Sequence, residues 1–185
     1  MKMKEGEYAI YLGKEYTSGC VRNNGKIILR STDIRDVKKG FEPCEPFRIK
    51  EEVEEIVCLK YVNLSEVEDY YLLRTYVLYR GYVFPVLEET EDQFSITSPA
   101  GDYRVWLSLG MKLIDKGVYQ KWIPKEEAAI RIEKEIYEPG KGFVSPTVIY
   151  EEKKDGFLWE DEKEKSHGGG KLSEIWRKFW KDDRF

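Results

Sequence analysis

Few residues in this chain have the types and spacing that catalysis needs. The single histidine, His167, precedes three glycines, and no cysteine or second histidine lies near it to share a metal ion. A serine or cysteine nucleophile needs a positioned base, and a histidine in a Gly-rich stretch cannot supply one. The His-Gly-Gly-Gly motif of lipases works only with a G-x-S-x-G elbow, which is absent here. We therefore expect no catalytic residue and no enzyme.

Cofactor and metal motifs are missing as well. Neither a P-loop nor a G-x-G-x-x-G fingerprint occurs, and Cys20, Cys44 and Cys58 have no zinc-site or disulfide-framework spacing. The first ten residues lack the apolar stretch of a signal peptide, and no apolar run is long enough to span a membrane. The sequence thus predicts a cytoplasmic protein without metal, cofactor or membrane contact.

Carboxylates are abundant and often adjacent, as at Glu51–Glu52, Glu54–Glu55 and Glu126–Glu127. Neighbouring side chains of a strand point to opposite faces, so such pairs cannot flank one glycosidic bond. The ordinary interpretation is exposed negative charge, and the functional one is an acidic binding face. An enzyme that uses carboxylate chemistry is the remaining catalytic alternative.

The charges are spread evenly along the chain. There are 31 basic and 35 acidic residues, which gives a net charge of −4. Because phosphate neutralisation supplies most of the affinity of a nucleic-acid binder, an even distribution argues against such a partner. The many tyrosines could stack on bases, but without accompanying positive charge we expect them in the core of a sheet.

An internal repeat shows the architecture. EYAIYLGKEY (7–16) returns as TYVLYRGYVF (75–84), at an offset of 68 residues, and each copy leads through a polar turn into a second apolar stretch. This pattern predicts two hairpins, with Gly13 and Gly81 in the same turn. The matched positions are Tyr8, Ile10, Tyr11, Gly13 and Tyr16 with Tyr76, Leu78, Tyr79, Gly81 and Phe84.

The similarity continues beyond the hairpins. Residues 33–41 and 103–111 predict short helical turns that end at a glycine. Residues 46–62 and 121–137 share Lys-Glu-Glu before an apolar run, which we interpret as a turn followed by a closing strand. The predicted fold is mainly β (α+β), with two tandem SH3-like small β-barrel modules. The alternative is one mixed α/β sandwich in which both halves share a sheet.

The predicted domains are 1–74, with a packed connector at its end, 75–137, and a C-terminal extension over 138–185. The extension starts at a Pro- and Gly-rich boundary and contains TVIYEEKKDGFLWEDE, which predicts a hairpin over 147–162. A Gly-rich linker leads to a helix with an apolar stripe. The stripe should dock on the chain itself, a second copy or a partner, in a monomer or weak homodimer. It consists of Leu172, Ile175, Trp176, Phe179 and Trp180.

The aromatic-rich opening hairpin and the segment LGMKLIDKGVYQKWIPKEE (109–127) are similar to small uncharacterised proteins of Gram-positive bacteria. Immunity proteins that accompany polymorphic secreted toxins are found among such groups. The resemblance covers residues 7–137. It implies an intracellular inhibitor that occupies the active site of a cognate toxin by surface complementarity, and it assigns no functional residue.

A protein partner of this kind would meet an acidic face with aromatic anchors. The alternative is an SH3-like adaptor that binds extended or proline-rich peptides. The candidate partner-binding residues are Glu51, Glu52, Glu54, Glu55, Trp122, Glu126, Glu127, Trp176 and Trp180.

Overall fold

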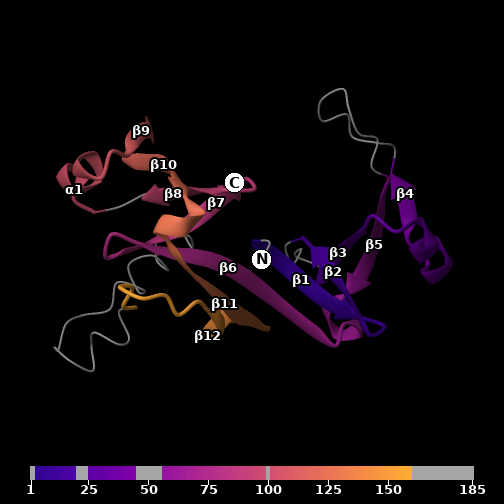
Figure 1. Cartoon of the computed structure of the whole chain (residues 1–185). Helices are drawn as coiled ribbons and strands as arrows, with labels where there is room; N and C mark the ends of the chain where they lie inside the picture. Colours follow the sequence, from indigo (N-terminus) through magenta and orange to yellow (C-terminus); the bar gives the residue numbers. More distant parts are fainter. Residues whose placement is uncertain (1–2, 20–24, 45–55, 99–100, 160–185) are drawn as a thin grey trace. The chain divides into compact units, whose positions relative to one another are not determined.

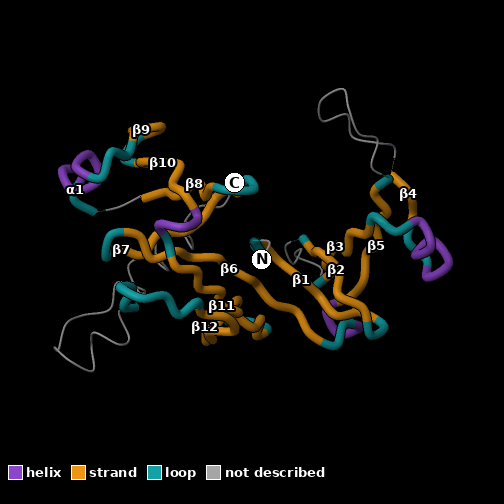
Figure 2. The backbone as a smooth tube through the Cα atoms, viewed as in Figure 1, coloured by secondary structure: helices purple, strands orange, loops and turns teal. Residues whose placement is uncertain are grey.

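The computed structural model describes residues 3–19, 25–44, 56–98 and 101–159 (Figure 1). The protein is mainly β, as expected, and its strands form an open antiparallel sheet. The strands are β1 (Gly6–Tyr11), β2 (Lys14–Ser18), β3 (Lys26–Ser31), β4 (Glu42–Cys44), β5 (Val57–Asn63), β6 (Asp69–Tyr79), β7 (Tyr82–Glu89), β8 (Gln93–Ser98), β9 (Lys112–Asp115), β10 (Val118–Pro124), β11 (Ala129–Glu138) and β12 (Gly142–Glu151). The helical segments are η1 (Ile34–Lys39), η2 (Leu64–Glu66), α1 (Tyr103–Ser108) and η3 (Lys125–Glu127), all short (Figure 2).

The chain divides into two compact units. The first unit contains residues 4–74 and 133–148, and the second contains Met3 and residues 75–132 and 149–159 among those described. Strand β6 belongs to the first unit up to Arg74 and to the second from Thr75 onward. Each unit is therefore assembled from separated parts of the sequence.

Both units have the same strand order. It is β6-β1-β2-β3-β5-β4 in the first unit and β11-β6-β7-β8-β10-β9 in the second. The helical segments also fall at equivalent places, since η1 and α1 follow the third strand, and η2 and η3 precede the closing strand. The expectation that the two copies share one strand order is confirmed.

The first turn of each unit has the predicted equivalence. Leu12 and Gly13 have φ values of 51° and 70°, and Arg80 and Gly81 have values of 50° and 84°. Two successive positive φ values define a type I′ turn, whose twist matches that of paired strands and which glycine adopts without steric cost. Gly13 and Gly81 thus occupy the same turn, as the repeat predicts.

One part of the predicted alignment is wrong. The Lys-Glu-Glu at 50–52 does not correspond to Lys125–Glu127, because the latter forms η3, which follows β10 as η2 follows β5. The true counterpart of Lys125–Glu127 is Leu64–Glu66. The same tripeptide occurs in both halves of the sequence, but it precedes β5 in the first half and follows β10 in the second.

The core of each unit lies on one face of its strands. Three of the six tyrosines of the repeat contribute to it as expected, namely Tyr11, Tyr16 and Tyr79. Tyr8 and Tyr76 are half-buried, and Tyr82 is exposed. Alternation along the strands places every second side chain inward. The first core contains Ala9, Tyr11, Tyr16, Ile27, Leu29, Phe41, Cys58, Val62 and Tyr70, and the second contains Val77, Tyr79, Phe84, Val86, Phe94, Ile96, Trp106, Met111, Ile123 and Ala128.

The predicted C-terminal hairpin over 147–162 is wrong. The hairpin that forms is β11–β12, which turns at residues 139–141, and residues 152–159 contain no strand. Strand β11 offers a free edge that takes up 142–151 as its partner, while Trp159 is buried instead of continuing a strand. The predicted helix with Trp176 and Trp180 lies outside the described residues, as do Glu51, Glu52, Glu54 and Glu55.

Candidate functional site

Trp122 is the aromatic residue around which a candidate binding surface can be built. It lies in β10 next to the fully buried Ile123 and points to the opposite face of the sheet, where 39% of its surface is exposed. Trp122 pairs with Ser95 of β8, and Ser95 pairs on its other side with Glu88 of β7. Directly opposed residues share a face, so Glu88, Ser95 and Trp122 form one row across three strands.

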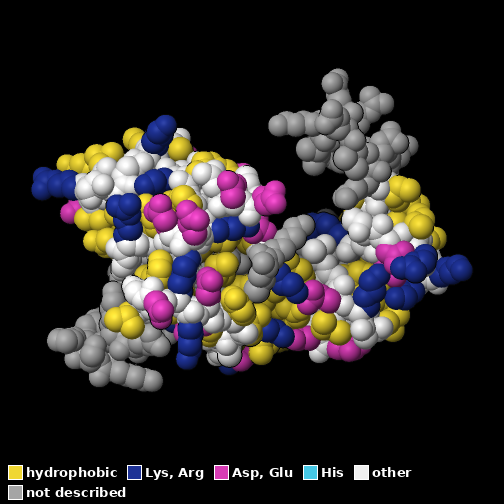
Figure 3. All heavy atoms as spheres, viewed as in Figure 1, with side chains coloured by type: hydrophobic (Ala, Val, Ile, Leu, Met, Phe, Trp, Pro, Cys, Tyr) yellow, Lys and Arg dark blue, Asp and Glu magenta, His cyan; other side chains and the backbone are white. Residues whose placement is uncertain are grey.

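Further acidic residues lie close to this row. The backbone N–H of Lys125 donates to the carbonyl oxygen of Asp92 at 2.9 Å, which holds η3 against the β7–β8 turn. The exposed carboxylates of the turn and of η3 therefore lie on neighbouring elements, and Figure 3 shows acidic side chains gathered on this part of the second unit. We call Glu88, Glu91, Asp92, Trp122 and Glu126 the acidic surface.

Two other carboxylates of this region are neutralised. The Nζ of Lys125 lies 3.1 Å from the Oε2 of Glu89 and 5.0 Å from the centre of the Phe94 ring. Glu127 lies 3.9 Å from Arg80. Within the part of the chain that the structure describes, no ion pair offsets the four carboxylates of the acidic surface.

The equivalent face of the first unit has a different character. Tyr61 of β5 takes the place of Trp122, is 52% exposed and pairs with Ile28 of β3. The residues that flank Ile28 on the same face of β3 are Lys26 and Arg30, both exposed. Both units thus present an aromatic side chain outward at the same position. The row of Tyr61 is flanked by Lys26 and Arg30, whereas the row of Trp122 contains Glu88.

Three of the predicted site residues fall in this region. Trp122 and Glu126 belong to the acidic surface, whereas Glu127 is paired with Arg80. Sequence reasoning missed Glu88, Glu91 and Asp92. Their signal was the acidic stretch EETED (88–92) between two apolar strands, which the β7–β8 register starts opposite Ser95, the strand partner of Trp122.

The described residues contain no group of three or more His, Cys, Asp or Glu side chains arranged to hold a metal ion. None of the helices in the described ranges is both long and apolar enough to cross a membrane.

These features define a duplicated, open antiparallel β protein with an exposed acidic and aromatic surface on one of its two units. The chain belongs to the family described as "Uncharacterised conserved protein UCP033725", whose match covers residues 3–139. The matched region ends before β12, so the segment over 142–159 lies outside it. Neither the comparison with curated proteins nor that with solved structures gave a match.

Proposed function

We propose that this protein is a non-enzymatic protein-binding module, and that it acts as an immunity protein that neutralises a bacterial toxin by covering the toxin's active site. The observation that carries the proposal is the acidic surface, in which an outward-facing tryptophan has Glu88 in its cross-strand row and three further exposed carboxylates on the adjoining turn and η3. A cytoplasmic location fits this role, because an inhibitor of this kind must meet the toxin inside the cell that it protects.

The two kinds of side chain have separate roles in binding. A large aromatic side chain buried at the centre of an interface supplies much of its free energy, while charged neighbours speed the encounter with an oppositely charged partner. The partner should therefore present a basic cleft that accepts an indole. The active site of a nuclease has this chemistry, since it must attract phosphates.

We also propose that each unit is an SH3-like module. The support is the shared strand order, together with a single helical turn directly before the strand that closes each unit, η2 before β6 and η3 before β11. Such modules often serve as scaffolds for binding, and their chemistry resides in the residues on their surface.

The first experiment asks whether a toxin is the partner. The product of the neighbouring gene is purified, its toxic activity is measured, and this protein is added in increasing amounts. Stoichiometric inhibition with a dissociation constant in the nanomolar range or below is the expected result. A neighbouring product that is toxic yet neither binds nor is inhibited would contradict the immunity proposal.

The second experiment tests the surface. Glu88→Lys with Glu91→Lys should slow association with the toxin by about tenfold or more at low salt, because charge steering acts on the association rate. Glu42→Lys with Glu138→Lys changes the net charge equally on the first unit and is the matched control. Trp122→Ala should weaken binding by about 30-fold, which corresponds to about 2 kcal/mol for an interface anchor. Equal effects of both double variants would exclude the acidic surface.

A further inference from the structure

The sheet of the second unit carries a second, smaller apolar cluster on the face that is turned away from its core, and we call the sheet residues of this cluster the pocket. Leu78 of β6 and Val83 of β7 pair directly, so their side chains share one face, while Val77 and Tyr79 belong to the core on the other. Ala129, at the start of β11, is fully buried and completes the pocket. All three residues lie within the matched region of the family.

A residue from outside that region fills the pocket. After β12 the chain returns along the second unit, and Trp159 packs on Leu78 and Ala129 with only 2% of its surface exposed. The guanidinium of Arg131 lies 4.2 Å from the centre of the Trp159 ring. Glu151 orients that guanidinium through contacts of 2.6 and 2.9 Å. The pocket therefore provides an apolar floor and a cation against the ring.

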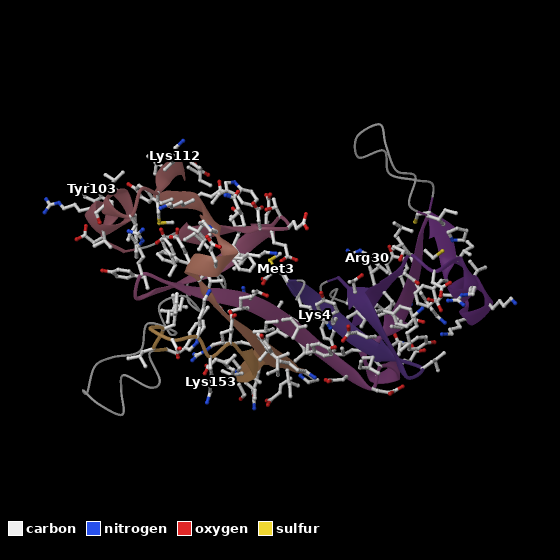
Figure 4. The ribbon with its side chains drawn as sticks, in the orientation of Figure 1. Met3, Lys4, Arg30, Tyr103, Lys112 and Lys153 are labelled. Carbon is white, nitrogen blue, oxygen red and sulfur yellow. The ribbon has the colours of Figure 1, made fainter. Side chains whose placement is uncertain are left out.

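The segment that carries Trp159 is attached by a small number of polar contacts. Glu152 donates its backbone N–H to the carbonyl oxygen of Ile130 at 2.7 Å. The Nζ of Lys154 donates to the carbonyl oxygens of Ala128, at 3.2 Å, and of Glu126. Lys153, labelled in Figure 4, lies beside β12 in the same segment. We call residues 152–159 the latch.

In the first unit the residues equivalent to Leu78 and Val83 have neighbours other than a latch. At an offset of 68, Leu78 and Val83 correspond to Ile10 and Glu15, which also pair directly. There Glu15 accepts hydrogen bonds from the hydroxyl of Tyr71 and from Lys4. The aromatic side chain beside this pair is therefore Tyr71 of the unit's own β6, with the Nζ of Lys134 3.8 Å from its ring centre, whereas in the second unit the aromatic side chain comes from the latch.

The fit between latch and pocket is imperfect. The indole Nε1–H of Trp159 is buried and has no hydrogen-bond partner among the described residues. A buried donor without an acceptor loses the hydrogen bond that it makes with water in the released state. This loss lowers the free-energy difference between the docked and the released latch, so the pocket is vacated more often than its apolar contacts alone would allow.

We propose that the pocket of Leu78, Val83, Ala129 and Arg131 is a binding site for the aromatic side chain of an extended peptide, and that the latch fills it in cis until a partner's segment replaces it. The latch itself defines the chemistry of the partner, a tryptophan preceded by a lysine that can reach the carbonyl oxygens of residues 126 and 128. This inference does not depend on the proposed role of the acidic surface.

Emptying the pocket in the full-length chain gives the first test. Trp159→Ala should gain saturable binding of indole and of the peptide EKKDGFLW, seen as a rise in melting temperature, whereas the wild-type chain should not bind indole. The same peptide with alanine in place of its tryptophan should bind at least tenfold more weakly. Trp122→Ala, which removes an exposed tryptophan, is the matched control and should gain no indole binding. Adding Arg131→Met to Trp159→Ala should weaken peptide binding several-fold.

Exchange is tested separately on the wild-type chain labelled with 5-fluorotryptophan. Excess peptide should move the fluorine resonance of Trp159 from a buried to a solvent-exposed position in the NMR spectrum. If Trp159→Ala folds and binds neither indole nor peptide, the pocket is not a binding site. If it binds both but the wild-type resonance does not move, exchange is refuted. If Trp159→Ala does not fold, the wild-type experiment decides alone: movement supports the proposal and no movement overturns it.

Discussion

The first and second units have one strand order but fill the space beneath their first helical segment in opposite ways. In the first unit this space holds a buried carboxylate, Asp36 of η1, and in the second it holds an indole, Trp106 of α1. The strand residue below follows the same division, because Tyr16 of the first copy is Phe84 in the second. The comparison teaches that this topology does not require one particular kind of core.

The carboxylate of Asp36 is held by four side chains. It accepts hydrogen bonds from Lys14 at 2.6 Å, from Ser31 at 2.6 Å and from Tyr16 at 3.1 Å, and Lys39 lies 3.2 Å away. Burial alone would raise the pKa of Asp36. The hydrogen bonds outweigh burial and hold the pKa well below its usual range.

Trp106 uses ring contacts in the same place. Its ring meets Phe84 edge to face with the centres 5.4 Å apart, and it meets Tyr82 at 5.7 Å. Gly101 allows this packing, because a Cβ at that position would come within 2.6 Å of the indole. The absence of a side chain at residue 101 is therefore part of the second core.

The largest expected effect comes from removing the indole. Trp106→Ala should destabilise the second unit by about 3–5 kcal/mol, the usual cost of truncating a large buried aromatic side chain. Amide hydrogen exchange should accelerate in β7, β8 and β10 and change much less in β2, β3 and β5. Equal acceleration in both units would show that the two cores do not act separately.

The next effect concerns the carboxylate. Asp36→Ala leaves the buried hydroxyls of Tyr16 and Ser31 without their acceptor, so we expect a loss of about 2–4 kcal/mol, confined to the first unit. Faster hydrogen exchange of the β2 and β3 amides would measure this loss of stability. Accelerated exchange of the β7 and β8 amides in this variant would show that the loss of stability is not confined to the first unit.

Acid should act on the same residue. The folded pKa of Asp36 lies below the value of about 3.9 of an unfolded chain. Its contribution is therefore complete above about pH 4 and is lost as the pH falls through the folded pKa. Asp36→Asn should abolish this part of the acid sensitivity of the first unit. Urea unfolding at pH 7 and pH 3, followed by the NMR signals of β2 and β3, measures it.

The smallest effect should be the same in both units. Lys60 donates to the Tyr11 hydroxyl at 2.9 Å and to the carbonyl oxygen of Lys39. Lys121 donates to the Tyr79 hydroxyl at 3.1 Å and to the carbonyl oxygen of Leu109. Lys60→Met and Lys121→Met should each cost about 1–2 kcal/mol, as expected for charge-assisted hydrogen bonds. The losses of stability are compared by urea unfolding, followed by the separate NMR signals of each unit. A difference above about 1 kcal/mol would mean that the hydrogen bonds of the two lysines are not equivalent.

The hairpins and their shared turn could be predicted from the sequence, because strand periodicity and a glycine with positive φ leave a local pattern. The equivalence of Lys60 and Lys121 could not be predicted, because β5 and β10 share few identical residues and the hydrogen-bond partners of the two lysines are distant in the sequence. The acidic surface could not be predicted either, because it depends on two strand registers that place Glu88 and Trp122 on either side of Ser95. The predicted pairing of TVIY with FLW failed because β11 offered a competing edge, and competition between distant segments leaves no local signal.

The division of the first unit between two separated stretches of sequence delays its completion during synthesis on the ribosome. The first unit has most of its residues once Arg74 has been made, but it also includes residues 133–148, which emerge only after residues 75–132 of the second unit. At about 5–20 residues per second, the intervening stretch takes several seconds to produce. For that interval the earlier half of the protein exists without its final strands, and cutting the gene at residue 74 would make this incomplete state permanent.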